Sequence, residues 1–398
     1  MRPYKINMHH VGGRGGGFPS FPMNSYFRSD MEMWIYDADA DCLRHMERYP
    51  GGVDHVISAA VAGTDGTADL NVNYDPYTSS LLTPNPARAG LYYQDETCDY
   101  ILEDVLKLVK SVPVQTCSLD SLITAHGSQV DYLSLDVQGI EYDLLAGVSD
   151  RTLSATVAIM CEISLFQFYS SQKLFDEIVR LLRGKGFFVA RFVPHGFEWG
   201  TCGSGIGWRG TGFTAHGDVL FFRDASHVVD QGGEPFLTLL KLAYVSMCFG
   251  NVSYALECLT AAYKVPPADL ATMKCEMGYI GFLDDVYGLY QKSPQICPLR
   301  FRHLWSVENS LSRFDVDSAY PVPNRAKVRD AYFAETDLEA FKRVVPELLS
   351  AAPTAFEALL RRNGFTALAD DVAKRRTKGV RELLAGLGMK LVGPSQAS

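Results

Sequence analysis

The sequence lacks several features that would each define a class of protein. No apolar run reaches the roughly 18 residues that a membrane-spanning helix needs, and residues 1–17 contain no continuous apolar stretch of the kind found in signal peptides. No Cys-x-x-Cys pair occurs, and the 9 cysteines are scattered from Cys42 to Cys297. We therefore expect no membrane span, no disulfide framework and no zinc knuckle, and we expect the reducing conditions of the cytoplasm.

An excess of positive charge is also missing. The 37 Lys and Arg residues are outnumbered by 46 Asp and Glu residues, which gives a net charge of −9. Surfaces that hold nucleic-acid phosphates are normally basic, so no nucleic-acid partner is expected. The proportions of hydrophobic (47%) and charged (21%) residues are those of a globular protein and exclude a disordered chain. A length of 398 residues predicts about two domains.

The first half of the sequence alternates short apolar runs with helical patterns, which is typical of a parallel α/β sheet. Helices are predicted at Ala40–Tyr49, Cys98–Val112 and Leu174–Arg183, and a hairpin turn at Thr64–Thr67 leads into a short strand at Ala68–Asn73. The predicted core strands are Lys5–Val11, Met33–Tyr36, His55–Val61, Val130–Asp136, Thr156–Cys161, Phe187–Val193 and Asp218–Phe222.

The pattern changes at about Glu234, beyond which helical periods replace strand signals, as in Phe236–Cys248 and Ser253–Tyr263. We place the domain boundary between Asp224 and Glu234 and predict an α/β domain at residues 1–228 and an all-α domain at residues 229–398. The helical domain is a candidate for homodimer formation or for recognition of a substrate. Its basic segment Lys374–Lys378 is most simply a solvated helix face, or else a guide for an anionic carrier.

A glycine cluster follows the first predicted strand directly. Glycines at such a turn let the backbone approach a ligand where a side chain would clash. The spacing Gly13-x-Gly15-x-Gly17 fits sites for S-adenosylmethionine (SAM) better than the dinucleotide pattern Gly-x-Gly-x-x-Gly, although Gly12 and Gly16 blur the distinction. No Gly-Lys-Ser/Thr follows, which excludes a P-loop. The loop alone leaves both SAM and NAD open.

Asp37 ends the second predicted strand, where an acid can accept hydrogen bonds from ribose hydroxyls. Alternatively Asp37 caps the helix expected from Ala40, but Asp39 would serve equally well as that cap. The glycine loop and Asp37 together indicate an adenosine-type cofactor.

Two further acids follow apolar strands. Asp136 ends the fourth strand of the core and Glu162 follows the fifth. Because the carboxyl ends of strands in doubly wound folds face the ligand, both should lie on the same edge as the glycine loop. They could position a substrate, take up a proton or hold a divalent metal. Asp136 could equally be the N-cap of the next helix, whereas capping does not favour Glu162.

Several ordered blocks of the sequence then resemble the FkbM family of SAM-dependent methyltransferases. That family has a Thr-Leu-Asp-x-Leu stretch, a block of the form Lys-x-Asp-Val-Glu-Gly-x-Glu, and a later strand ending in Glu. The similarity spans about residues 8–223. The matching blocks here are Val114–Leu122, Asp131–Gly147 and Cys161-Glu162, with Ala59–Thr67 and Ser79–Leu81 as central segments.

The resemblance implies a class I methyltransferase fold, in which helices cover both faces of a doubly wound, mostly parallel seven-stranded sheet whose last strand is antiparallel. It implies SAM as methyl donor and O-methylation of a hydroxyl on a sugar, glycan or natural product. On this mapping Asp136 lies near the transferred methyl. The implied cofactor-binding residues are Gly12, Gly13, Arg14 and Gly15 at the methionine end, Asp37 at the ribose, Ala59 and Ser80 in the central segments, and His10, which stands where the family often has an acid for the SAM ammonium group.

A hydroxyl acceptor must lose its proton, so a base is expected on the same edge. His195 and His216 flank the connection between the last two strands, and His has a suitable ordinary pKa. Asp136 and Glu162 are the other candidates. A Mg²⁺ site at these two acids has no dedicated motif to support it, and His9 and His10 point to opposite faces of a strand.

Two other functions compete with this interpretation. An NAD-dependent sugar-modifying enzyme would need Gly-x-Gly-x-x-Gly and a Tyr-x-x-x-Lys pair, which we do not find. A methyltransferase-like domain without activity would act by binding a partner through the helical half. The expected partner of the enzyme is a small-molecule or glycan acceptor.

Overall fold

The computed structural model describes residues 5–12, 28–39, 53–88, 91–94, 99–194, 197–200, 213–231, 234–262 and 264–265, together with Asp370 and Ala373. Nearly all of them belong to the first of two compact units, which comprises Met1–Cys248 and Tyr254–Met273. The second unit comprises Phe249–Ser253 and Lys274–Ser398. The predicted helix at Ala40–Tyr49 lies outside the described residues, and the all-α character of residues 229–398 stays a prediction.

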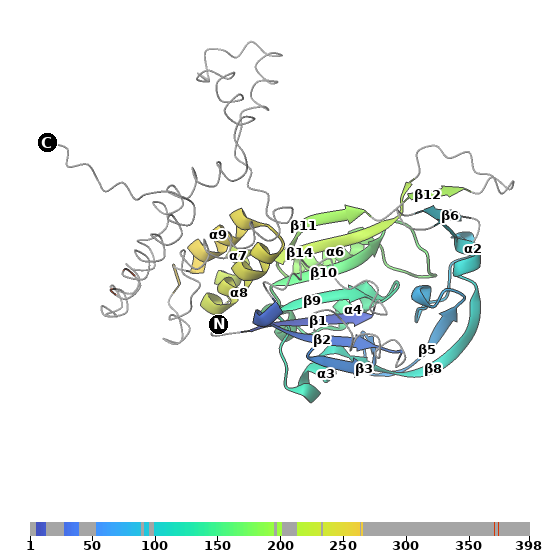
Figure 1. The fold of residues 1–398 in the computed structure, drawn as a ribbon, viewed down its shortest axis with the longest axis horizontal. Coiled ribbons are helices and arrows are strands. Elements are labelled where there is room, and N and C mark those ends of the chain that lie inside the picture. The colour runs from blue at the N-terminus through green and yellow to red at the C-terminus, as the bar shows by residue number, and fades with distance from the viewer. Residues whose placement is uncertain are drawn as a thin grey trace, which may run out of the picture. The chain divides into compact units, whose positions relative to one another are not determined.

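A seven-stranded sheet forms the centre of the first unit, in the order β11-β14-β10-β9-β1-β2-β3 (Figure 1). Its strands are apolar because both faces are covered; Tyr36, Ile159 and Phe221 are fully buried. The bounds are β1 Ile6–Gly12, β2 Met31–Asp37, β3 His55–Ser58, β9 Tyr132–Asp136, β10 Ala158–Ser164, β11 Phe187–Pro194 and β14 His216–Arg223.

This sheet is mixed, which corrects the expected mostly parallel sheet. β1 pairs with β2 and β9 in parallel, and β9–β10 and β2–β3 are parallel as well. β14, however, runs antiparallel to both of its neighbours, β10 and β11. An antiparallel strand brings its first residues to the edge where the parallel strands end. His216 and Asp218 therefore lie beside the carboxyl end of β10.

Two smaller sheets were not predicted from the sequence. One has the order β4-β8-β5 and the other β13-β12-β6-β7. The predicted hairpin is wrong, because β4 and β5 each pair with β8, which lies between them. The bounds are β4 Ala60–Ala62, β5 Gly66–Asn73, β6 Leu91–Gln94, β7 Asp99–Ile101, β8 Leu108–Ser118, β12 Phe197–Gly200 and β13 Phe213–Thr214.

The helix predicted at Cys98–Val112 is also wrong over most of its length. The segment contributes β7, one short helix and the start of β8, whose Leu108 and Val109 are 47% and 61% exposed. Its apolar spacing fits a helix, but pairing with β5 fixes the backbone as a strand, which local periodicity cannot reveal.

Helices cover the sheet and lie at its amino edge. Amphipathic α6 buries Ile178 and Leu182, while Ser118 and Ser149 cap α3 and α5 through their side chains. The bounds are α2 Leu102–Val105, α3 Leu119–His126, α4 Glu141–Gly147, α5 Asp150–Ala155, α6 Phe175–Gly184, α7 Ala225–Gln231, α8 Pro235–Cys248 and α9 Val252–Ala262, with 3₁₀ turns η2 Arg28–Asp30, η3 Pro76–Thr78 and η4 Pro86–Arg88.

α7, α8 and α9 gather beyond the end of the sheet where the parallel strands begin (Figure 1). Lys241 of α8 forms a buried ion pair of 2.7 Å with Asp131, the residue before β9. Asp131 also accepts hydrogen bonds from the backbone and the side chain of Asn7 in β1. Because a buried charge needs a partner, α8 is fixed to the strands that it covers. No helix in the described part of the chain is long and apolar enough to cross a bilayer.

The buried His9 makes a prediction about stability. Its ring contacts the Tyr36 hydroxyl and the Gln129 carbonyl, both at 2.9 Å, and burial lowers the His9 pKa from 6.5 to about 4. A lowered pKa stabilises the folded state above the unfolded-state pKa, and this contribution is lost as the pH falls from 6.5 toward 4. This difference in the His9 pKa between the folded and unfolded states corresponds to about 3 kcal/mol of unfolding free energy.

The difference in unfolding free energy between the wild type and His9→Gln should therefore shrink by about 3 kcal/mol between pH 6.5 and pH 4. Urea unfolding at a series of pH values measures it. A difference that is independent of pH would show that His9 is not kept neutral by burial.

Candidate functional site

Two neighbouring cavities lie at the carboxyl ends of β1, β2, β9 and β10. The Gly12 cavity is lined by residues that include Gly12, Asp37, Ala59, Ser80 and Asp136. The Glu162 cavity is lined by residues that include Asp75, Glu141, Glu162, Tyr169 and His216. Tyr77 and Gln138 line both, so the two cavities adjoin. The structure thus brings together six of the residues that the sequence predicts for a cofactor and its chemistry.

Gly12 joins β1 to β9 at the floor of its cavity. It pairs with Asp136 in the sheet and has a φ of +84°, which disfavours any residue with a side chain. A Cβ atom at this position would lie 2.0 Å from the Asp136 carbonyl oxygen. Only glycine therefore lets the two strand ends meet here and leaves the space above them open.

Asp37 ends β2 on the same edge and is 7% exposed. Its Oδ1 accepts a hydrogen bond of 2.8 Å from the Asp39 backbone, and its carbonyl accepts one from the Ala59 amide. The predicted strand His55–Val61 breaks at Ala59 into β3 and β4. This break lets Ala59 face the cavity from the side.

The Ser80 hydroxyl, 2% exposed, donates a hydrogen bond of 2.6 Å to the Gln138 carbonyl and accepts one from the Leu82 amide. Ser80 therefore holds the turn after β9 rather than presenting an unused hydroxyl to the cavity.

Asp136 and Glu162 lie side by side on adjacent strands. The last residues that pair between β9 and β10 are Leu135 and Cys161, and each acid follows directly. β10 nevertheless continues to Ser164 along β14, so Glu162 lies inside a strand and not after it as predicted. The Gln138 side-chain amide bridges the two acids, donating to Asp136 Oδ1 at 2.6 Å and to Glu162 Oε2 at 3.2 Å.

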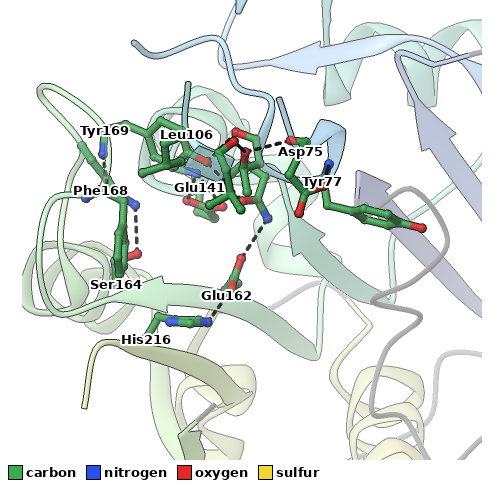
Figure 2. A pocket seen from close by; sticks show the side chains of 14 residues that line it. Asp75, Tyr77, Leu106, Glu141, Glu162, Ser164, Phe168, Tyr169 and His216 are labelled. Carbon is green, nitrogen blue, oxygen red and sulfur yellow. Dashed lines mark hydrogen bonds and ion pairs between the residues drawn. The ribbon is translucent and has the colours of Figure 1, made fainter. Parts of the chain in front are cut away.

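Figure 2 shows Glu162 between His216 on one side and Glu141 and Asp75 on the other. The distance from Glu162 Oε1 to His216 Nε2 is 3.7 Å. About a quarter of the Glu162 side chain is exposed, at 24%, so it faces the cavity. Glu141 instead has a structural task, because its carboxylate accepts hydrogen bonds from the Val137 and Gly139 amides and so shapes the turn after β9.

The acids Asp136, Glu141 and Glu162 are largely buried and lie close together, and this raises their pKa values. Burial and the nearby charges of Asp136 and Glu141 raise the pKa of Glu162 well above its ordinary value. Burial also raises the pKa of Asp136, and the hydrogen bond from Gln138 opposes that rise. Burial, with the Asp136 charge, raises the pKa of Glu141 to about 7. Adjacent carboxylates cannot both ionise easily, so the charge on either Asp136 or Glu162 disfavours ionisation of the other.

His10 lies in β1 two residues before Gly12 and pairs with Ser134 of β9, and its Nδ1 is 2.9 Å from the Ser134 hydroxyl. Burial lowers the pKa of His10 to about 4, so the ring is neutral at pH 7. Gly13, Arg14, Gly15 and His195 lie outside the described residues. Among the described residues, no group of three or more His, Cys, Asp or Glu side chains is arranged to hold a metal ion.

Sequence reasoning missed three residues of the site. Gln138 and Tyr169 connect the acids to the cavity wall, and Tyr77 lines both cavities. A polar residue followed by Gly139 directly after a buried strand was the available signal for Gln138. Nothing in the local sequence distinguishes Tyr77 or Tyr169 from other tyrosines.

A comparison with family models matches residues 43–189 to the methyltransferase FkbM domain. This segment of the chain is therefore similar to the FkbM methyltransferase domain. The matched residues include Ala59, Ser80, Asp136 and Glu162, whereas Gly12 and Asp37 precede them. The family resemblance predicted from the sequence is confirmed.

Among solved structures, the chain is similar to magnesium protoporphyrin IX methyltransferase from Synechocystis PCC 6803, crystallised with SAM and with S-adenosylhomocysteine. Sequence identity is 11% in both cases, 56% of this chain is covered, and 71% and 75% of the other chains are covered. The TM-score of 0.27 is too low for this likeness to bear on the site. No curated protein sequence matches the chain.

Proposed function

We propose that the protein transfers a methyl group from SAM to a hydroxyl group of a sugar, glycan or natural product. SAM occupies the Gly12 cavity and the acceptor occupies the Glu162 cavity. The observation that carries the proposal is that two cavities adjoin at one sheet edge of an FkbM methyltransferase domain, with a pair of acids at the junction.

The residues of the Gly12 cavity fit SAM. Gly12 removes the side chain that would fill the floor of the cavity, which suits the close approach of a ligand to a strand end. Asp37 places a carboxylate at the tip of the second strand, where a ribose is held in such folds. Ala59, Val61 and Leu81 supply an apolar wall for the adenine. When bound, SAM supplies an activated methyl group on a positively charged sulfur.

The chain's own residues orient the acceptor and remove its proton. The Glu162 cavity presents Tyr77, Phe168 and Tyr169 as flat surfaces beside polar groups, which suits a hydroxyl-bearing ring. The acceptor hydroxyl gives its proton to Glu162 Oε1. Alignment of the reacting atoms by the walls of both cavities supplies much of the rate. His195 and His216 remain candidates for assisting this step.

Calorimetric titration with SAM and S-adenosylhomocysteine, with NAD⁺ as control, tests the proposal. We expect micromolar binding of the first two and none of NAD⁺. A screen of hydroxyl-bearing acceptors with methyl-labelled SAM then identifies the substrate. Binding of NAD⁺ alone would overturn the proposal in favour of a dehydrogenase, and binding of none of the three would favour a binding module. The cytoplasmic location and a homodimer stay predictions.

Replacing Asp37 by alanine should weaken SAM affinity by about tenfold to a hundredfold, because hydrogen bonds from ribose hydroxyls to a carboxylate are lost. Calorimetry with the Asp37→Ala protein measures the change. Asp69→Ala removes an exposed acid from β5 and serves as the control. Equal affinity in both variants would remove Asp37 from the ribose role.

A further inference from the structure

Gln138 stands where the two cavities meet, in the turn between β9 and α4. The activity itself needs no glutamine at this position, since an amide neither gives nor takes a proton under ordinary conditions. Its contacts nevertheless connect four separate segments of the site, which suggests that Gln138 has a role other than proton transfer.

The backbone of Gln138 adopts an unfavourable conformation. Its φ of +54° lies in the left-handed region, which costs a non-glycine residue about 1 kcal/mol. Two contacts hold it there: the Ser80 hydroxyl donates to the Gln138 carbonyl at 2.6 Å, and Gly139, with φ +102°, packs so closely on Tyr169 that a Cβ would lie 2.9 Å from its ring. Such maintained strain is typical of functional positions.

The strained backbone of Gln138 places its side-chain amide between the two acids. The Nε2 group donates one hydrogen bond to Asp136 and one to Glu162, using both of its protons on the acid pair. The Oε1 atom accepts a hydrogen bond of 3.3 Å from the Tyr169 hydroxyl, which also donates to the Thr78 carbonyl at 2.6 Å. Every polar atom of the Gln138 amide is therefore engaged, and its orientation is fixed.

We propose that Gln138 is the positioning residue of the acid pair: its amide holds the Asp136 and Glu162 carboxyl groups at the junction of the cavities and stabilises negative charge on them. This inference rests on the proposed function, because it assigns the acid pair to proton uptake from the acceptor. Donors to a carboxylate favour its ionised form, so Gln138 favours the form of the pair that can accept a proton.

Other titratable groups face the same pair from each neighbouring element. The carboxylates of Asp37, Glu141 and Asp218 favour protonation of the pair, whereas a protonated His216 would oppose it. A neutral donor between the acids stabilises the charge that these carboxylates disfavour. The titratable groups around the pair are Asp37 at the end of β2, Glu141 on α4, Asp218 and His216 on β14, His10 on β1, Asp75 before η3, and Tyr169 in the loop after β10.

Two substitutions of Gln138 test the effect of its amide donor separately from the effects of side-chain length and backbone conformation. Gln138→Glu has the same reach but replaces the donor by an acid. Gln138→Asn keeps an amide and tolerates a positive φ, but it is one methylene too short to bridge the pair. Gln167→Glu adds the same charge at an exposed position outside the Glu162 cavity and serves as the control.

The readout is infrared titration of the full chain, which follows the carbonyl band of protonated carboxyl groups against pH. The band of the pair is identified by its loss in Glu162→Gln. We expect its midpoint to rise by about one pH unit or more in Gln138→Glu and by a smaller amount in Gln138→Asn. Gln167→Glu should titrate like the wild type. Urea unfolding of each variant confirms that it is folded.

A midpoint in Gln138→Asn equal to that of the wild type overturns the proposal, because the donor then has no effect. A shift confined to Gln138→Glu overturns it too, since an added charge alone explains that result. The titration needs neither SAM nor an acceptor. Its failure is therefore distinguishable from failure of the proposed function, which would appear as absent binding of SAM and S-adenosylhomocysteine to the wild-type protein.

Discussion

Replacing Gly12 by alanine is expected to reduce SAM affinity by at least a hundredfold. The new Cβ would lie 2.0 Å from the Asp136 carbonyl oxygen, a distance that no relaxation of a flexible side chain can relieve because the contacting atom belongs to the backbone. The ends of β1 and β9 must then separate, and the floor of the Gly12 cavity shifts with them. Calorimetry with SAM measures the loss.

Gly127→Ala provides the matched control. Gly127 ends α3 with a φ of +64°, close to the +84° of Gly12, but a Cβ there meets nothing within 4 Å. Its substitution introduces the backbone strain alone, about 1 kcal/mol of stability, without a steric clash. SAM affinity should stay at the wild-type level in Gly127→Ala. Comparable losses in both variants would mean that backbone strain, and not the clash at the strand junction, is responsible.

Glu162→Gln is expected to lower kcat by about a hundredfold to a thousandfold while SAM affinity changes less than threefold, because a general base contributes that much and Glu162 does not line the Gly12 cavity. Turnover is measured with methyl-labelled SAM and the acceptor found in the screen. The exposed Glu257 on α9 supplies the control substitution Glu257→Gln.

The pH dependence of kcat gives a second measure of the same role. Since burial and neighbouring acids raise the pKa of Glu162, the ionised form needed for proton uptake is lost at a higher pH than in an ordinary glutamate, and kcat should fall as the pH is lowered. In Glu162→Gln this limb of the profile should disappear or move to lower pH, where Asp136 titrates alone. Wild-type turnover with an unchanged profile would exclude Glu162 as the proton acceptor.

Most of the central sheet could be predicted from the sequence, because its inner strands are buried on both faces and read as apolar runs. α6 and α9 were predicted because apolar residues repeat at helical spacing, and α8 because its apolar run is long enough for a buried helix. The errors fell on β4, β5 and β8, where the pairing of distant segments determines the structure. Half-exposed segments carry no strong local signal, so a spacing of apolar residues can match two elements at once.

The site was partly predictable for a topological reason. Gly12, Asp37, Asp136 and Glu162 lie at strand ends, and parallel strands bring their carboxyl ends to one edge. The roles of Gln138 and Tyr169 depend on the path of the turns after β9 and β10, which no short pattern specifies. His216 reaches the same edge only because β14 is antiparallel.

The register of Gly12 against Asp136 also has a consequence for how the molecule assembles. The residues that form the floor of the Gly12 cavity are separated by more than a hundred positions in the chain, and the contact of Lys241 with Asp131 spans a similar interval. Folding must close loops of this length, and the chain loses conformational entropy before the new contacts stabilise it. This slows folding, as in other sheets dominated by non-local pairing. A fragment that lacks β9 also lacks half of the cavity floor, so the capacity to bind a ligand requires both ends of this long-range pairing.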